Sequence, residues 1–190
     1  TPNVKVAYAP VMSMTALLLQ TKDPLLSNPK MRQALAHAID YEQLAAAVTE
    51  GLAKPNNSIV PLVSPYHDAT QKEGWKYDVA LSQKLLKEAG YKGQEIELMT
   101  TKRYPQSYNS AVIIQAMLQA AGINAKLSVA EWATQLDRYN AGTYQMMTFP
   151  YSARLDAALN YEMVTGEKSK QPRKVCLLYT SDAADEEDSV

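Results

Sequence analysis

The chain has 190 residues, of which 46% are hydrophobic and 21% are charged, and its formal net charge is −1 at pH 7. This length is typical of one domain, and the hydrophobic fraction is enough for a core, so the composition excludes wholesale disorder. No apolar run reaches the ~20 residues that cross a bilayer, and no basic stripe indicates a nucleic-acid partner.

The first part of the chain shows two strand patterns and the start of a helix. Residues 3–8 alternate between polar and apolar side chains, and residues 14–21 form an apolar run. These patterns predict two short strands, of which the second is buried. A helix is expected to follow, because Asn28 can cap its first turn and Pro29 suits its first position.

Two more helices are expected on either side of a long surface segment. Asp40 and Gln43 resemble a capping box at the start of one helix, and Gly51 is expected to end it. Residues 53–74 contain three prolines and little periodicity, which indicates a segment that lies on the surface. Residues 77–91 (YDVALSQKLLKEAGY) predict an amphipathic helix with Asp78 as its N-cap and Gly90 at its end.

The next part of the chain indicates a βαβ unit. Residues 94–101 and 123–129 alternate as strands, and residues 107–122 between them are helical. This order predicts two parallel strands joined by a crossover helix. The inward face of that helix is expected to carry Val112, Ile113, Ala116, Met117 and Ala120. A helix over 130–142 and a strand over 143–150 follow, so the sequence predicts an α/β fold with a small mixed sheet flanked by helices.

Residues able to perform catalysis or hold a metal are few. His37 lies in an apolar helix and is interpreted as structural, and His67 has no further histidine or cysteine nearby to complete a metal site. Glu95 and Glu97 look like a carboxylate pair, but the alternation of a strand explains them as its solvated face. The sequence also lacks a glycine-rich phosphate loop and a nucleophile elbow. We therefore expect a protein that is not an enzyme and that holds neither a metal nor a cofactor.

Candidate ligand-binding residues come from the position of two loops. In open α/β sheets, ligands bind beyond the carboxyl ends of the strands, and residues 102–108 and 149–156 are expected at such ends. Arginine pairs with carboxylates through two hydrogen bonds, and tyrosine offers a flat surface with a polar tip. The candidates on these loops are Arg103, Tyr104, Tyr151, Ser152 and Arg154. The alternative is that Arg154 pairs with Asp156 or Glu162 and only braces its loop.

Three separated motifs resemble a known family. R-x-A-L-x-x-A-I-D occurs at residues 32–40, L-L-x-E-A-G-Y at 85–91 and I-Q-x-x-L-x-x-x-G-I at 114–123. In this order they are similar to the C-terminal lobe of the extracytoplasmic solute-binding proteins of peptide-type ABC importers. That family includes oligopeptide-, dipeptide-, nickel- and opine-binding members. The similarity extends over about residues 1–168, which would be roughly a third of a full chain.

The resemblance implies one lobe of a two-lobe periplasmic-binding-protein (flytrap) fold that closes on its solute. It implies a monomer that captures a peptide or another small molecule and delivers it to the transmembrane subunits of an ABC permease. The expected location is periplasmic or extracytoplasmic, with membrane contact only through the permease or a lost lipid anchor. The alternatives are a nickel, opine or sugar-acid binding protein of the same family, or a solute-sensing domain of a cytoplasmic regulator.

The resemblance also bears on the charge of the solute. Peptide-binding members often carry an aspartate shortly after the last strand here, and it pairs with the α-ammonium group of the ligand. If Asp156-Ala157 stands at the acidic-proline step of the family, that position falls near Ala153, so the acid is absent. The neighbouring Arg154 would instead favour an anionic or carboxylate-bearing solute.

The C-terminal tail differs from the rest of the chain. CLLYTSDAADE, which starts at Cys176, resembles a translated transposase sequencing adaptor, and residues 176–190 contain five acidic residues but no lysine or arginine. We expect residues 1–175 to be a partial C-terminal lobe and residues 176–190 to be a non-native, disordered tail. The alternative is a natural acidic tail. Cys176, the only cysteine, is expected to have no functional role.

Overall fold

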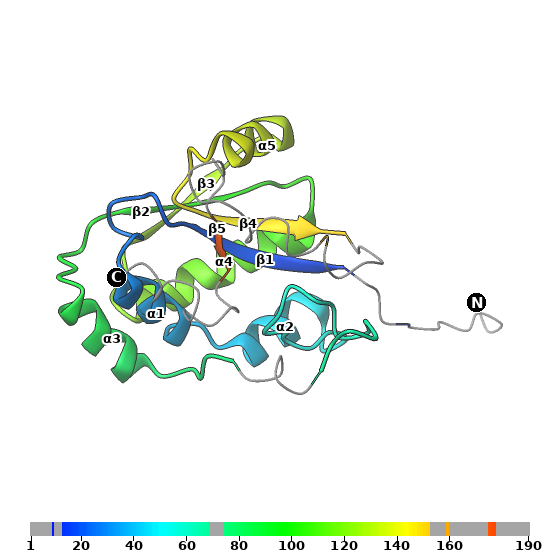
Figure 1. Cartoon of the computed structure of the whole chain (residues 1–190), viewed down its shortest axis with the longest axis horizontal. Coiled ribbons are helices and arrows are strands. Elements are labelled where there is room, and N and C mark those ends of the chain that lie inside the picture. Colours follow the sequence, from blue (N-terminus) through cyan, green and yellow to red (C-terminus); the bar gives the residue numbers. More distant parts are fainter. Residues whose placement is uncertain (1–8, 10–12, 69–73, 153–158, 160–174, 178–190) are drawn as a thin grey trace.

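The computed structural model describes residues 9, 13–68, 74–152, 159 and 175–177. Its strands are β1 (Met14–Gln20), β2 (Ile96–Thr100), β3 (Ala125–Val129), β4 (Met146–Tyr151) and β5 (Val175–Leu177). Its helices are α1 (Pro29–His37), α2 (Tyr41–Thr49), α3 (Val79–Glu88), α4 (Pro105–Ala120) and α5 (Trp132–Ala141). The predicted α/β architecture is confirmed, whereas the strand expected over residues 3–8 lies outside the described residues (Figure 1).

The strands form one mixed sheet in the order β3-β2-β4-β1-β5. β2 runs parallel to β3 and β4, as expected for the βαβ unit, and β1 runs antiparallel to β4. Met14, at the start of β1, pairs with Tyr151, at the end of β4. One border of the sheet is therefore formed by strand ends: the carboxyl ends of β2, β3 and β4 and the amino end of β1. We call this border the carboxyl edge.

Both faces of the sheet are covered, and alternate residues of each central strand enter separate cores. On one face, Leu17 and Leu98 pack in a cluster that includes residues of α1, α3 and α4. On the other face, Leu18 and Met99 pack in a cluster that includes Tyr139 of α5. Burial on both sides explains why residues 16–19 of β1 are all apolar instead of alternating with polar residues.

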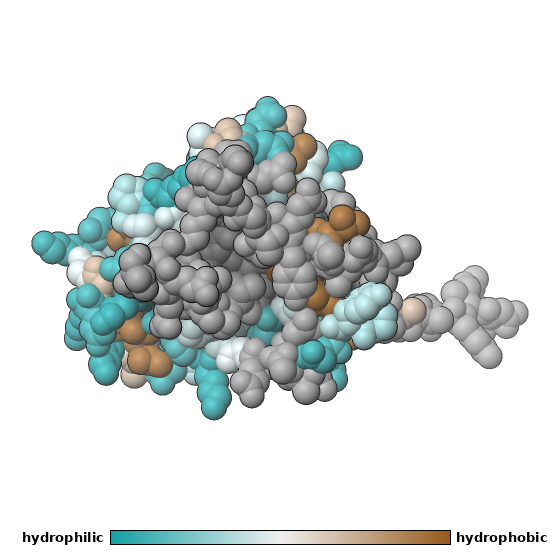
Figure 2. All heavy atoms as spheres, viewed as in Figure 1, coloured by the Kyte–Doolittle hydropathy of each residue, from teal (hydrophilic) through white to brown (hydrophobic). Residues whose placement is uncertain are grey.

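The outer surface is more polar than these cores. On the face viewed in Figure 2, hydrophilic residues cover most of α3 and α5, and hydrophobic residues form separate, smaller patches. Within the part of the chain that the structure describes, no helix is both long enough and apolar enough to cross a membrane.

Local signals in the sequence placed the starts of α1, α2 and α3 correctly, whereas α4 begins at Pro105 and α5 at Trp132, each two residues from the expected start. The side chains of Asn28, Asp40 and Asp78 each accept a hydrogen bond from a backbone N–H two or three residues further along, as N-caps do. The end of α2 differs slightly from the expectation. Glu50 already adopts a left-handed backbone conformation, with φ of 53°, before Gly51, with φ of 79°.

The predicted inward face of α4 is wrong. Val112 was expected inside, but it is 40% exposed. The residues that α4 buries are Ser107, Ser110, Ala111, Ile114 and Leu118. Apolar residues occur on several sides of this helix, and two of the positions that face the sheet are serines. Hydrophobic periodicity therefore could not select the buried face.

The boundary expected between the lobe and its tail falls inside β5. Val175, Cys176 and Leu177 pair with β1, with Leu177 opposite Leu18, although we expected the tail to begin at Cys176 and to stay apart from the body. The outermost strand of a sheet has free backbone N–H and C=O groups along its side. It can therefore pair with an extended segment of almost any sequence. Residues 178–190 lie outside the described residues, and their non-native origin stays a prediction.

Candidate ligand-binding site

The two predicted loops start from the same edge of the sheet. The first leaves β2 after Thr100, and the second leaves β4 after Tyr151, and the two strands are parallel neighbours. The start of α5 is held at the same edge, because Ala130 N–H donates to the carbonyl of Thr100 at 2.9 Å. The carboxyl edge therefore brings together residues from three separate parts of the chain.

Aromatic rings form a continuous row at the carboxyl edge. The Tyr104 ring lies edge-to-face against Trp132, with centroids 4.9 Å apart, and Trp132 lies 5.4 Å from Phe149. Phe149 in turn lies 5.1 Å from Tyr151 and stacks on Tyr139 at 4.5 Å. We call these five residues the aromatic row. Such contacts contribute about 0.5–1.5 kcal/mol each beyond the area that they bury, so the row holds the two loops together.

The aromatic row contains two predicted site residues and three that the sequence reasoning did not propose. Tyr104 and Tyr151 were candidates, and the structure connects them through Trp132 and Phe149. Trp132 and Tyr139 lie in the helix that was expected over residues 130–142, but neither was a candidate for the site. Trp132 is half-buried, and its place at the start of the helix that follows β3 is the signal that could have identified it.

Arg103 stands at the start of α4 with its side chain exposed. Its backbone N–H donates to Thr101 Oγ1 at 3.3 Å, while no hydrogen bond or ion pair to its guanidinium group is found within the described ranges. Tyr104 is the N-cap of α4 and provides no side-chain hydrogen bond there, and the buried Ser107 hydroxyl has no partner either. A cationic side chain beside the uncapped amides of a helix start can hold an anionic group.

The structure describes only one of the other two candidates. Ser152 follows β4 directly and is exposed. Arg154 lies outside the described residues, as do Asp156 and Glu162, so its role in ligand binding and the competing ion pairs both stay predictions.

The two histidines have partners that agree with structural roles. His37 Nδ1 lies 2.7 Å from the carbonyl oxygen of Lys76, and its ring lies edge-on to Trp75. His67 Nε2 lies 3.3 Å from Asn56 Oδ1. Among the described residues, no group of three or more histidine, cysteine, aspartate or glutamate side chains is placed to hold a metal ion.

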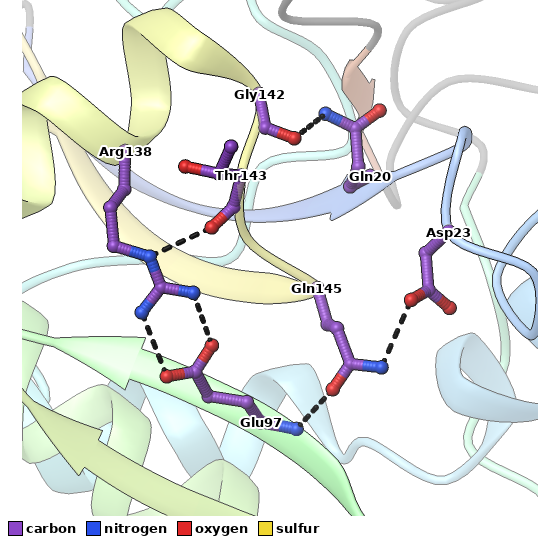
Figure 3. Close-up of polar contacts among 7 residues, drawn as sticks. All are labelled: Gln20, Asp23, Glu97, Arg138, Gly142, Thr143 and Gln145. Atoms are coloured by element: carbon purple, nitrogen blue, oxygen red, sulfur yellow. Dashed lines mark hydrogen bonds and ion pairs between the residues drawn. The ribbon is translucent and has the colours of Figure 1, made fainter.

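A polar network lies at the opposite edge of the sheet, and the expectation that Glu97 is merely solvated is wrong (Figure 3). The guanidinium of Arg138 on α5 donates to both carboxylate oxygens of Glu97 on β2, at 2.9 and 2.7 Å, and to the carbonyl of Thr143 at 2.7 Å. These hydrogen bonds hold the pKa of the Glu97 carboxyl below its ordinary value. Glu95 keeps the predicted exposed position, where it pairs with Lys126 at 3.3 Å.

The same network ties the ends of three strands together. Gln145 accepts from the Glu97 N–H at 2.8 Å and donates to Asp23 at 3.0 Å, and Gln20 donates to the carbonyl of Gly142 at 3.0 Å. A shallow hollow of about 300 Å³ lies over these residues. Because the hollow is at the amino ends of β2 and β4, it is separate from the two predicted loops. We interpret the network as a brace that holds α5 against the sheet.

The Glu97–Arg138 pair predicts a specific dependence of stability on pH. Because the folded pKa of Glu97 is lowered, the pair stabilises fully above the unfolded glutamate pKa of about 4.3, and its contribution is lost as the pH falls through the folded value. At pH 7, Glu97→Gln should lower the free energy of unfolding by about 1 kcal/mol, a figure reduced for solvent screening.

Urea unfolding at pH 7 and at about pH 3 would measure this effect. The difference between Glu97→Gln and the parent chain should shrink at the acidic pH, because the unfolded glutamate binds a proton there and the ion pair of the folded state then contributes less. Glu95→Gln is the matched control, because its ion pair is exposed and should contribute little at either pH. A difference that persists unchanged in acid would contradict the assignment.

Comparison with known proteins agrees with the predicted family. Residues 1–171 match the family model described as "Bacterial extracellular solute-binding proteins, family 5 Middle". The dipeptide-binding protein of Escherichia coli K12 is 31% identical over 149 residues, which cover 75% of this chain and 28% of that protein. The chain thus spans little more than a quarter of the length of this curated relative.

Solved structures show the same fold. DppA of Helicobacter pylori, in complex with the peptide STSA, is 26% identical with a TM-score of 0.73, covering 86% of this chain and 32% of that one. AgaA of Agrobacterium tumefaciens, in complex with agropinic acid, is 27% identical with a TM-score of 0.66, covering 75% and 29%. The predicted fold, one lobe of a periplasmic binding protein, is confirmed. This chain therefore belongs to family 5 of the bacterial extracellular solute-binding proteins.

Proposed function

We propose that the complete protein is the solute-binding component of an ABC importer, and that it captures a peptide or a related small solute at the carboxyl edge. The observation that carries the proposal is the arrangement at that edge, where Arg103 and the uncapped start of α4 adjoin the aromatic row. An arginine and free helix amides suit a carboxylate, and aromatic rings suit an apolar side chain or a planar group.

The names of the relatives support this class of solute. The E. coli relative is a dipeptide-binding protein, and the H. pylori structure holds a tetrapeptide. We propose that the complete protein works as a monomer in the periplasm or anchored outside the cell, that it delivers its solute to the transmembrane subunits of a permease, and that it has no catalytic activity.

An opine or sugar acid is the second candidate. The structure of AgaA contains agropinic acid, and that protein is as similar in sequence to this chain as the peptide-bound one. An exposed arginine without a partner among the described residues would serve either kind of anionic solute. The two candidates differ in whether an α-ammonium group contributes to binding.

Calorimetry on the complete protein, stripped of bound solute by unfolding and refolding, would test the proposal. The panel consists of di- to tetrapeptides, the same peptides with an amidated C-terminus or an acetylated N-terminus, opines, sugar acids and nickel. We expect binding of peptides with a free carboxylate and weaker binding after amidation. Binding of nickel alone, or of no member of the panel, would overturn the proposal.

The 190-residue chain alone should bind the same solute far more weakly. Small-molecule sites bury most of the ligand surface, and one lobe supplies only one wall of such a site. Submicromolar binding of a peptide to the isolated chain would show that the carboxyl edge is already a complete site.

A further inference from the structure

Apolar side chains are concentrated on one part of the described surface. Eight large hydrophobic residues are exposed, and four of them lie within residues 51–68. These are Leu52, Leu62, Val63 and Tyr66, with exposed fractions of 64%, 45%, 42% and 60%. Single exposed apolar residues are normal on any protein, but several on one short segment mark a contact surface.

This segment is held firmly although it has no helix or strand. Ile59 is 3% exposed and packs in the cluster of Leu18 and Met99, and Val60 is 1% exposed. Asn56 bridges the turn, because its side chain donates to the Val60 carbonyl at 2.8 Å and accepts from the Ser58 N–H at 3.2 Å. The exposed apolar side chains are therefore presented by an anchored backbone.

The helix that precedes the segment continues the same surface. α2 has no buried residue, although five of its nine residues are aliphatic. Ala46 and Ala47 are exposed, and Leu44 and Val48 are half-buried. We call α2 together with residues 51–68 the apolar margin. Residues 51–67 contain one charged residue, Lys54, and the rest of the margin adds the exposed Glu42 and Asp68, so the margin suits a partner surface that is mainly apolar.

The position of the apolar margin indicates which surface covers it. α2 and the segment lie beside the amino end of β1, at the lower right of Figure 1, and Met14 places that end at the carboxyl edge. Chain that precedes β1 joins the described body there. The E. coli relative has 72% of its length outside the part that this chain covers, because 28% is matched. A large body of chain outside the matched part is thus available to cover the exposed apolar residues.

We propose that the apolar margin is the surface on which the remaining part of the complete solute-binding protein packs. The proposal builds on the proposed function, since it assigns the margin to contact between the lobes and leaves the carboxyl edge for the solute. The partner is expected to present an apolar patch of its own, because charged groups opposite these side chains would lose hydration without finding counter-charges.

Cysteine labelling of the complete protein, without added solute, tests the proposal. Tyr66→Cys and Tyr77→Cys form a matched pair, because the two tyrosines are 60% and 53% exposed in this chain, and Tyr77 is outside the residues that define the margin, just before α3. In a background without other reactive cysteines, Tyr66→Cys should react with a thiol reagent about tenfold more slowly than Tyr77→Cys. Both should react equally fast in denaturant.

Two outcomes would overturn the proposal. Equal reaction rates at the two positions would show that the margin is open to solvent in the complete protein. Protection that disappears on dilution would show that a second copy, and not the rest of the same chain, covers it. Leu52→Cys provides an independent variant if Tyr66→Cys does not fold. Labelling needs no solute, so its result is separate from a failure of the peptide-binding test.

Discussion

Replacement of Arg103 by alanine in the complete protein should weaken the binding of a carboxylate-bearing solute by roughly 10- to 150-fold, because a charge-assisted hydrogen-bonded contact contributes about 1.5–3 kcal/mol. The exposed guanidinium at the start of α4 has no partner among the described residues, so alanine should not unfold the loop. Arg103→Lys should restore only part of the affinity, since an ammonium lacks the planar fork.

Lys102→Ala is the matched control for Arg103→Ala. Lys102 is the neighbouring exposed cation, and its ammonium group lies 5.5 Å from the centre of the Tyr108 ring. Its loss changes the net charge by the same amount but should leave affinity within about twofold, as expected for a screened surface charge. Calorimetry would measure affinity, and thermal unfolding would measure stability. Unchanged affinity for Arg103→Ala would remove Arg103 from the site.

Arg154, the other arginine predicted to contact the solute, provides a second, independent test. If it contacts the solute, Arg154→Ala should weaken binding by a factor similar to that for Arg103→Ala. If it instead pairs with Asp156 or Glu162, the substitution should lower the thermal midpoint and leave affinity unchanged. A variant that lacks both arginines would show whether the two groups act on one carboxylate, because their effects would then fail to add.

Leu118→Ala should be among the most destabilising single changes in this chain. Leu118 is completely buried on α4, in the cluster that includes Leu98 and Met146. Truncating a buried leucine removes its transfer free energy and leaves a cavity, so we expect the free energy of unfolding to fall by about 2–5 kcal/mol. For a chain of this length, that corresponds to a thermal midpoint lower by roughly 5–20 °C.

Val112→Ala is the control for Leu118→Ala on the same helix. Val112 is 40% exposed, and alanine has the higher helix propensity, so stability should change by less than about 0.5 kcal/mol. Because periodicity placed Val112 inside, the pair of variants distinguishes the observed face of α4 from the predicted one. A large loss for Val112→Ala with a small one for Leu118→Ala would favour the predicted face.

Local features of the fold could be predicted from the sequence because their causes are local. Asn28, Asp40 and Asp78 cap helices through amides two or three residues away, so each cap depends on a short stretch of chain. The alternation and spacing around α4 similarly predicted two parallel strands, β2 and β3. From that order followed the position of the loop after β2, which carries Arg103 and Tyr104.

The remaining features depend on residues that are far apart in the chain. Glu97 and Arg138 are 41 positions apart and pair only because α5 packs on β2, so an alternating strand pattern wrongly left Glu97 in solvent. The buried face of α4 was decided by the sheet beneath it, which accepts Ser107 and Ser110 and leaves Val112 outside. Trp132 and Phe149 likewise come into contact only because α5 packs against the sheet beside β4.

What the sequence alone determined about this protein is therefore the order of its elements, the starts of its three capped helices and its family. These properties come from backbone hydrogen bonding and hydrophobic period, which act over a few residues. The tertiary structure alone decided which face each helix buries, which charges pair, and where the apolar margin lies. These properties depend on which side chains come into contact when distant segments of the chain pack together. The local pattern of residue types along the sequence does not specify those contacts.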